Sequence, residues 1–164
     1  HALPGSHRLP SDTVELVRSF YDFEFSAFAE PGERFVLANG DSSPIGQTIS
    51  ALAERSISSF LLPTPDSGPP VEIDDELARA ISDLVVEILE QESTFSDGQN
   101  SKAKPTVLKP EHIGIVATHR SMNTRIANRL PVKLRQMIKV DTTERWQGLE
   151  RKLMIAVHPL SSTP

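Results

Sequence analysis

The stretch IKVDTTERWQGLERKLMIAVHP, residues 138–159, places a polar elbow between two apolar segments. Ile138 and Val140 predict a short strand, and the run LMIAV at residues 153–157 predicts a second one. Between them lie hydroxyl, amide and carboxylate side chains that packing alone does not require. In an α/β sheet, such a segment presents polar groups at the carboxyl end of a strand. The stretch therefore predicts an α/β sheet with a candidate ligand site at its elbow.

The elbow residues have both a ligand-binding and a purely structural interpretation. Thr142 and Thr143 suit a phosphate or a sugar, because small donors at a strand end position a nucleic-acid backbone without reading bases. Thr142, or Asp141 in its place, equally suits the N-cap of a short helix. Gly148 allows either the close approach of a ligand or a helix stop with positive φ, and Trp146 suits a core position. From the elbow alone, both interpretations stay open.

Length and composition bound the class of protein. A chain of 164 residues predicts one domain, with residues 63–70 and 93–105 as flexible loops. A formal net charge of −5 argues against a freestanding high-affinity DNA-binding domain. Lys and Arg nevertheless outnumber Asp and Glu between residues 102 and 152, so a polyanion would meet this half of the chain. The absence of cysteine excludes disulfides and thiolate chemistry and is compatible with a cytoplasmic location. No apolar run is long enough to span a membrane, and no membrane partner is expected.

The clearest helical pattern covers residues 74–91. Asp74, Asp75 and Glu76 stand at its start, where carboxylates interact favourably with the helix dipole. This position explains the three acids without a metal, and no metal site is expected. The predicted apolar face comprises Leu77, Ile81, Leu84, Val85, Ile88 and Leu89.

Residues 113–117, IGIVA, predict a buried strand, because they are apolar without alternation. Residues 118–131 predict a helix with Met122, Ile126 and Leu130 on one face. A strand that leads into a helix N-terminus favours an anion at that point, although His119 equally suits an ordinary surface position. Patterns in the first half predict a helix over residues 13–21, a strand over 34–38 and a helix over 45–62.

Three segments, in this order along the chain, resemble the second RecA-like domain of superfamily I helicases of the Upf-like or AAA-type (1B) branch. Residues 6–25 resemble motif IV, with Arg8 on the arginine of that motif, although His7 and Pro10 depart from its usual pattern. Residues 113–130 resemble the family's strand–[TP]-Y-[RN]-x-Q segment. The elbow resembles motif V, T-x-[DE]-x-[FW]-Q-G-x-E, through Thr142, Glu144, Trp146, Gln147, Gly148 and Glu150.

The resemblance implies a RecA-like parallel sheet with flanking helices that lacks its own Walker A loop, since no G-x-x-x-x-G-K-[ST] occurs in the chain. Motif VI is also missing, so the chain is expected to be part of a longer protein. ATP and Mg²⁺ would bind mainly to the first RecA-like domain of that protein, and this chain alone would be inactive.

The resemblance also implies roles for particular residues. Arg8 would act catalytically by reaching the γ-phosphate, because a guanidinium neutralises developing charge. The nucleotide would be contacted by Gln147, Gly148 and Glu150. Single-stranded DNA or RNA, which the sequence does not distinguish, would be contacted by Thr118, His119, Arg120, Thr142 and Thr143.

Two other classes of function remain open. The first is a helicase-derived binding or scaffold module in which the motif residues have become structural. The acidic net charge and the departures at His7 and Pro10 favour this alternative slightly. The second is an unrelated doubly wound enzyme domain that uses the elbow as its own ligand site. No H-E-x-x-H, paired-histidine or G-x-S-x-G pattern offers a competing catalytic centre.

Overall fold

A computed structural model describes residues 5–6, 9, 11–20, 23–28, 35–37, 47–48, 51, 73–96 and 104–157. They belong to two compact units, each described here by itself: His1–Leu61 with Glu92–Val107, and Leu62–Gln91 with Leu108–Pro164. The expectation of one domain over the whole chain stays a prediction. Arg8, the predicted loop at 63–70 and most of the predicted helix at 45–62 lie outside the described residues.

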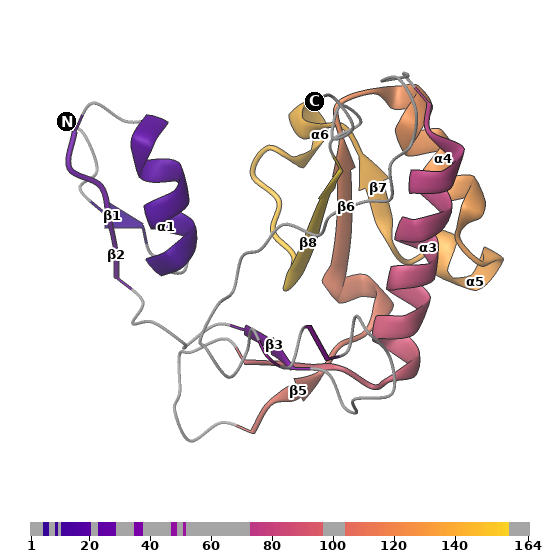
Figure 1. The fold of residues 1–164 in the computed structure, drawn as a ribbon, viewed down its shortest axis with the longest axis horizontal. Helices are drawn as coiled ribbons and strands as arrows, with labels where there is room; N and C mark the ends of the chain where they lie inside the picture. The colour runs from indigo at the N-terminus through magenta and orange to yellow at the C-terminus, as the bar shows by residue number, and fades with distance from the viewer. Residues whose placement is uncertain are drawn as a thin grey trace. The chain divides into compact units, whose positions relative to one another are not determined.

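The second unit is built on a three-stranded parallel sheet (Figure 1). Strand β6 (Ile113–Ala117) is central, between β7 (Lys139–Asp141) and β8 (Leu153–Val157). Gly114 lies opposite Lys139 on one neighbour and Met154 on the other. The parallel α/β architecture predicted from the apolar runs is therefore confirmed in this unit.

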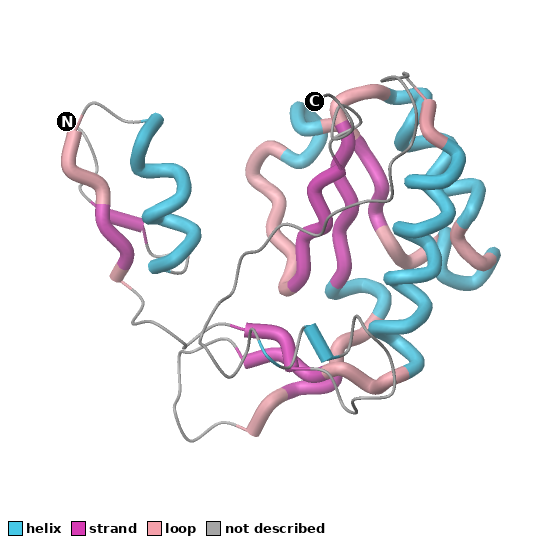
Figure 2. The backbone as a smooth tube through the Cα atoms, in the orientation of Figure 1, coloured by secondary structure: helices cyan, strands magenta, loops and turns pink. Residues whose placement is uncertain are grey.

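Helices cover one face of this sheet (Figure 2). Helix α4 (Arg120–Arg129) connects β6 to β7 and packs on both strands, and α3 (Asp75–Glu90) packs on α4. Ile113 and Ile115 of the central strand are fully buried, as are Met122 and Ile126 of α4. Shorter elements complete the unit: η2 (Pro110–His112), α5 (Val132–Arg135) and α6 (Thr143–Trp146).

Helix α3 has the boundaries that its sequence predicts. The carboxylate of Asp74 accepts a hydrogen bond from the Leu77 amide at 2.9 Å, which satisfies one of the free donors of the first turn. Asp75 forms ion pairs with Arg125 at 3.3 Å and Arg129 at 3.2 Å. Two of the three clustered acids are thus used in capping and helix pairing. Within the predicted apolar face, the buried residues are Leu77, Ile81, Val85 and Ile88.

On the opposite face of β6 the side chain of Trp146 packs against the strand. The indole of Trp146 lies directly over Gly114, where a Cβ atom would be 2.5 Å from Trp146 Cη2 and 2.7 Å from Met154 Sδ. The indole N–H donates to the carbonyl of Ile115 at 3.1 Å. Trp146 is only 7% exposed, so the core position that its type suggests is confirmed.

Strand β8 confirms the strand predicted over residues 153–157, but its apolar residues are only partly buried. Met154 and Ala156 are exposed, whereas Val157 is buried. The exposed residues lie opposite Gly114 and Val116, on the face of the sheet that carries Trp146. Apolar composition therefore overestimated burial here, because helices α3 and α4 cover only the other face.

In the first unit, β1 (Gly5–Ser6) and β2 (Ser26–Ala27) pair in parallel, and α1 (Ser11–Val17) and η1 (Arg18–Phe20) lie between them in sequence. The helix predicted over residues 13–21 thus begins earlier and ends as a 3₁₀ turn. Within this segment Val14 is buried, whereas Leu16 is 67% and Phe20 is 83% exposed.

Strands β3 (Phe35–Leu37), β4 (Thr94–Ser96) and β5 (Thr106–Val107) form an antiparallel sheet. Strand β3 confirms the strand predicted over residues 34–38. Strand β4 lies within the predicted loop over residues 93–105. Thr94 and Phe95 favour extended backbone, and pairing on both sides with β3 and β5 outweighs the polar composition around them.

We predict that Gly114→Ala lowers the free energy of unfolding by about 1–3 kcal/mol, because the added methyl group collides with the indole. Trp146→Phe removes the ring atoms nearest to that methyl group. In a Trp146→Phe background, Gly114→Ala should therefore cost much less. Urea denaturation of the two single variants and the double variant measures this coupling, and additive effects would contradict the packing described.

Candidate functional site

Two polar segments follow neighbouring strands of the parallel sheet. Residues 118–120 follow β6 and residues 142–144 follow β7, and parallel strands end at the same edge of a sheet. Arg120 is near enough to act electrostatically on Glu144. The structure therefore brings together the residues predicted to contact nucleic acid. The exposed residues at this edge are Thr118, His119, Arg120, Thr143 and Glu144, and Thr142 is buried.

The first segment is held by a side chain that the sequence analysis did not select. Asn123 Oδ1 accepts from the Ala117 amide at 3.1 Å, and Asn123 Nδ2 donates to the Ala117 carbonyl at 3.0 Å. This pair of bonds locks the last residue of β6 to the first turn of α4. Its signal in the sequence is a polar residue beside Met122 and three positions before Ile126, where the helical pattern predicts burial.

The second segment is organised around Glu144. Its own backbone N–H, and next the Thr142 hydroxyl, hydrogen-bond its carboxylate and hold the pKa below the ordinary value of 4.5. The charge of Arg120 acts in the same direction, whereas the charge of Asp141 opposes it. Thr142 occupies the N-cap position of α6 as predicted, but its side chain makes no capping bond to the helix backbone. Its hydroxyl serves the carboxylate instead.

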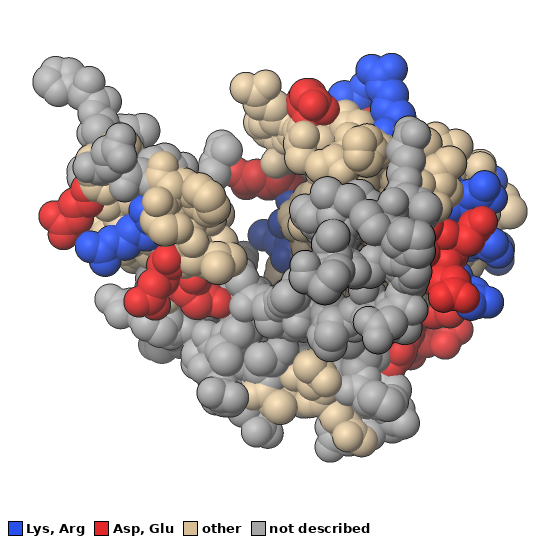
Figure 3. All heavy atoms as spheres, turned by 45° about the horizontal axis from the view of Figure 1, so that its top comes forward, with Lys and Arg blue, Asp and Glu red and all other residues tan. Residues whose placement is uncertain are grey.

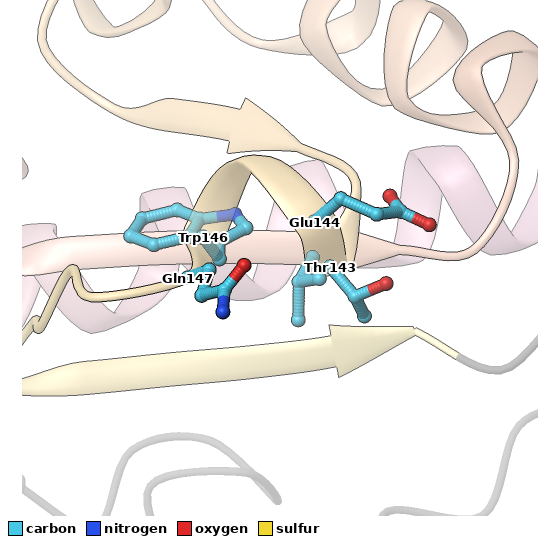
Figure 4. Close-up of a pocket in the computed structure, with 5 residues that line it drawn as sticks. Thr143, Glu144, Trp146 and Gln147 are labelled. Carbon is cyan, nitrogen blue, oxygen red and sulfur yellow. The ribbon is translucent and has the colours of Figure 1, made fainter.

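A shallow, open hollow lies beside α6 (Figure 4). The indole of Trp146 lies back along β6, whereas the carboxylate of Glu144 points toward the carboxyl ends of the strands. The hollow has an apolar floor and a polar rim at the strand ends. It is lined by Val116, Thr143, Glu144, Trp146 and Gln147.

The residues predicted to contact the nucleotide follow α6. Gln147, Gly148 and Glu150 are exposed, and Gln147 reaches the hollow. Gly148 has φ of +78° with open space around its Cα, so the predicted helix stop is confirmed. The open space also leaves its backbone accessible. Arg8, the predicted catalytic arginine, lies outside the described residues.

The basic residues of α4 and α5 do not form a free stripe. Arg125 and Arg129 pair with Asp75, and Arg135 donates to the carbonyl of Asn128 at 2.7 Å. Figure 3 shows acidic and basic side chains next to one another on the side where α3 and α4 lie. Cations of the second unit that stand nearer the strand ends, above all Arg120, are better placed for an anionic ligand.

Two cations beside the elbow were not predicted from the sequence. Lys139 Nζ lies 5.1 Å from the centroid of the Trp146 ring, and Arg151 Cζ lies 5.4 Å from it. Lys139 alternates with Val140 along β7, so the period of a strand places it on the face of Gly114. Nothing in the local pattern around Arg151 indicates its contact with the indole.

The edge supplies hydroxyl groups, a guanidinium and the first backbone amides of α4, with Glu144 as an acceptor. Such a set suits the binding of a phosphate–sugar backbone. None of the helices within the described ranges combines the length and the apolar character needed to cross a bilayer. Comparison with models of protein families, with curated proteins and with solved structures finds no match. Function is therefore inferred from the chain's own residues.

We predict that Thr142→Val raises the pKa of Glu144 toward its ordinary value, because the isosteric change removes one hydrogen bond to the carboxylate. NMR titration of the Glu144 carboxyl carbon measures the change. Since the folded-state pKa is depressed, Glu144 contributes stability above its ordinary pKa, and this contribution is lost as pH falls through the depressed value. The stability gap between the wild-type chain and Glu144→Gln should close in acid. An unchanged titration in Thr142→Val would contradict the assigned hydrogen bond.

Proposed function

We propose that this chain is the second RecA-like motor domain of an ATP-dependent nucleic-acid helicase or translocase. In this proposal, a first RecA-like domain of the same protein binds most of the ATP and Mg²⁺, and the present chain closes over the nucleotide. The chain by itself binds single strands or nucleotide weakly and does not hydrolyse ATP. Its role is to couple contact with the nucleotide to the binding of single-stranded DNA or RNA.

One observation carries the proposal: residues 118–120 and 142–144, which resemble two separate helicase segments, meet at the carboxyl edge of one parallel sheet. Open α/β sheets bind their ligands at this edge. Hydroxyl groups and Arg120 provide donors for phosphates and sugars, and such contacts fix the position of a strand without reading its bases.

The elbow divides the two tasks between its ends. Thr142, at the N-cap position of α6, and Thr143, its first residue, belong to the edge proposed for the single strand. Gln147, Gly148 and Glu150 follow α6 and would contact the nucleotide, with Glu150 accepting from a ribose hydroxyl and Arg8 reaching the γ-phosphate. Closure of two domains around a ligand is a common way to couple such contacts.

The alternative of a helicase-derived scaffold module has its own supporting observations. Trp146 is accounted for by packing and Gly148 by its positive φ. A module of this kind needs neither nucleotide nor turnover. The two proposals differ in whether the exposed residues Glu150 and Arg120 affect ATP hydrolysis and strand binding.

The first test is ATP hydrolysis by the intact protein, with and without single-stranded DNA and RNA. We expect stimulation by a single strand, and a loss of at least about tenfold in turnover for Arg8→Ala and for Glu150→Gln. Glu111→Gln is the matched control, because Glu111 is an exposed acid that precedes β6, near the amino edge of the sheet. Turnover that is absent in the wild type, or unchanged in both variants, would favour the scaffold module.

The second test is binding of labelled oligo(dT) and oligo(U) to the chain across a range of salt concentrations. Arg120→Ala should weaken binding of both strands and reduce the slope of log affinity against log salt by about one, the value for one lost phosphate contact. Arg79→Ala on α3 removes an exposed cation away from the edge and should leave the slope unchanged. Equal slopes for both variants would remove Arg120 from the site.

A further inference from the structure

Trp146 has two cations over one indole. The Nζ atom of Lys139 lies 5.1 Å from the ring centroid, and the Cζ atom of Arg151 lies 5.4 Å from it. Both distances are within the range in which a cation is attracted by the ring quadrupole. Neither cation is part of the resemblance that led to the proposed function.

Each cation also holds a backbone carbonyl beside the segment from Gln147 to Glu150. Lys139 Nζ donates to the carbonyl of Arg145 at 2.9 Å, just before this segment. Arg151 Nη1 donates to the carbonyl of Glu150 at 2.8 Å, at its end. Residues 147–150 are all exposed, so packing restrains them little. The contacts at the two ends of this segment therefore contribute much to its backbone conformation.

The indole itself is fixed to the sheet. Its N–H donates to the Ile115 carbonyl, and its ring fills the place of a side chain at Gly114. The segment starts from this anchor, because the Leu149 amide donates to the Trp146 carbonyl at 2.9 Å. Arg151 then returns to the same indole, so the segment is a loop whose beginning and end meet at one buried ring.

Arg151 is held there without full hydrogen bonding. Its Nε atom is buried and has no hydrogen-bond partner among the described residues. A buried donor without a partner opposes the observed position. The contact with the indole and the bond to the Glu150 carbonyl favour this position and offset the cost.

We propose that Arg151 is a positioning residue: through its cation–π contact with Trp146 it closes the loop of residues 147–150 and sets the conformation in which Gln147, Gly148 and Glu150 are presented. The geometric part of this inference concerns the loop alone, and its consequence for nucleotide contact rests on the proposed function. The same indole anchors α6, whose first residues, Thr143 and Glu144, belong to the edge proposed for the single strand. The packing of Trp146 on the sheet therefore links the start of α6 to the loop of residues 147–150.

The test compares Arg151→Met, which keeps a long apolar side chain without the charge, with Arg151→Lys, which restores a cation. Lys133→Met on α5 is the control, because it removes an exposed cation far along the chain from the indole. Amide hydrogen exchange is followed at residues 148–150 and along β6, with thermal unfolding in parallel. Trp146 is the chain's single tryptophan, so its emission reports the environment of the indole directly.

In Arg151→Met we expect exchange within residues 148–150, measured at the Leu149 amide that bonds to the Trp146 carbonyl, to rise about fivefold, the effect of losing one cation–π contact, with exchange in β6 unchanged. The emission of Trp146 should shift, and Arg151→Lys should restore both observations. Lys133→Met should match the wild type. If Arg151→Met does not fold, Arg151→Gln serves in the same comparison.

Exchange that is unchanged at residues 148–150, or that rises equally in the loop and in β6, would overturn the inference. This outcome is distinct from failure of the proposed function. The latter would appear in the wild-type protein as ATP hydrolysis that no single strand stimulates, and the loop measurement does not depend on it.

Discussion

The contact between the Trp146 indole and Gly114 is the constraint on which the second unit depends. It covers the face of β6 that α3 and α4 leave open, and it fixes α6, a helix of only four residues. A helix that short has no stability of its own in water, so its position comes from tertiary packing. The polar residues at the start of α6 and those that follow the helix are presented where they are because this one ring is held against the sheet.

Structural and functional roles coincide in the elbow instead of excluding each other. Thr142 is buried at an N-cap position, yet its hydroxyl acts on Glu144. Gly148 ends the helix, and its positive φ also leaves an exposed backbone next to Gln147 and Glu150. Buried residues position the exposed ones, which is the arrangement that a binding site on a rigid scaffold requires. For this reason a packing explanation of one residue does not remove a function from its neighbour.

The number of basic side chains available to a ligand at the candidate site depends on their contacts within the protein more than on the composition of the sequence. Arg125 and Arg129 join α4 to α3 through Asp75, whereas Lys139 and Arg151 are used at the indole. The excess of basic residues in this part of the sequence thus overstates the number available to a polyanion. Arg120 is exposed at the edge, beside a carboxylate whose charge it helps to stabilise.

The sequence by itself determined the strands β6, β7 and β8, the extent of α3, the apolar face of α4 and the turn at Gly148. These features follow from the spacing of apolar residues, from an N-cap aspartate and from the freedom of glycine, all of which act within a few residues. Tertiary structure alone decided the lock between Asn123 and Ala117, the exposure of Met154 and the two cations on Trp146. Local sequence patterns do not predict these contacts, because each contact depends on where the folded backbone brings a particular side chain. The ring of Trp146 meets the carbonyl of Ile115 from 31 positions away, and only the folded sheet brings them together.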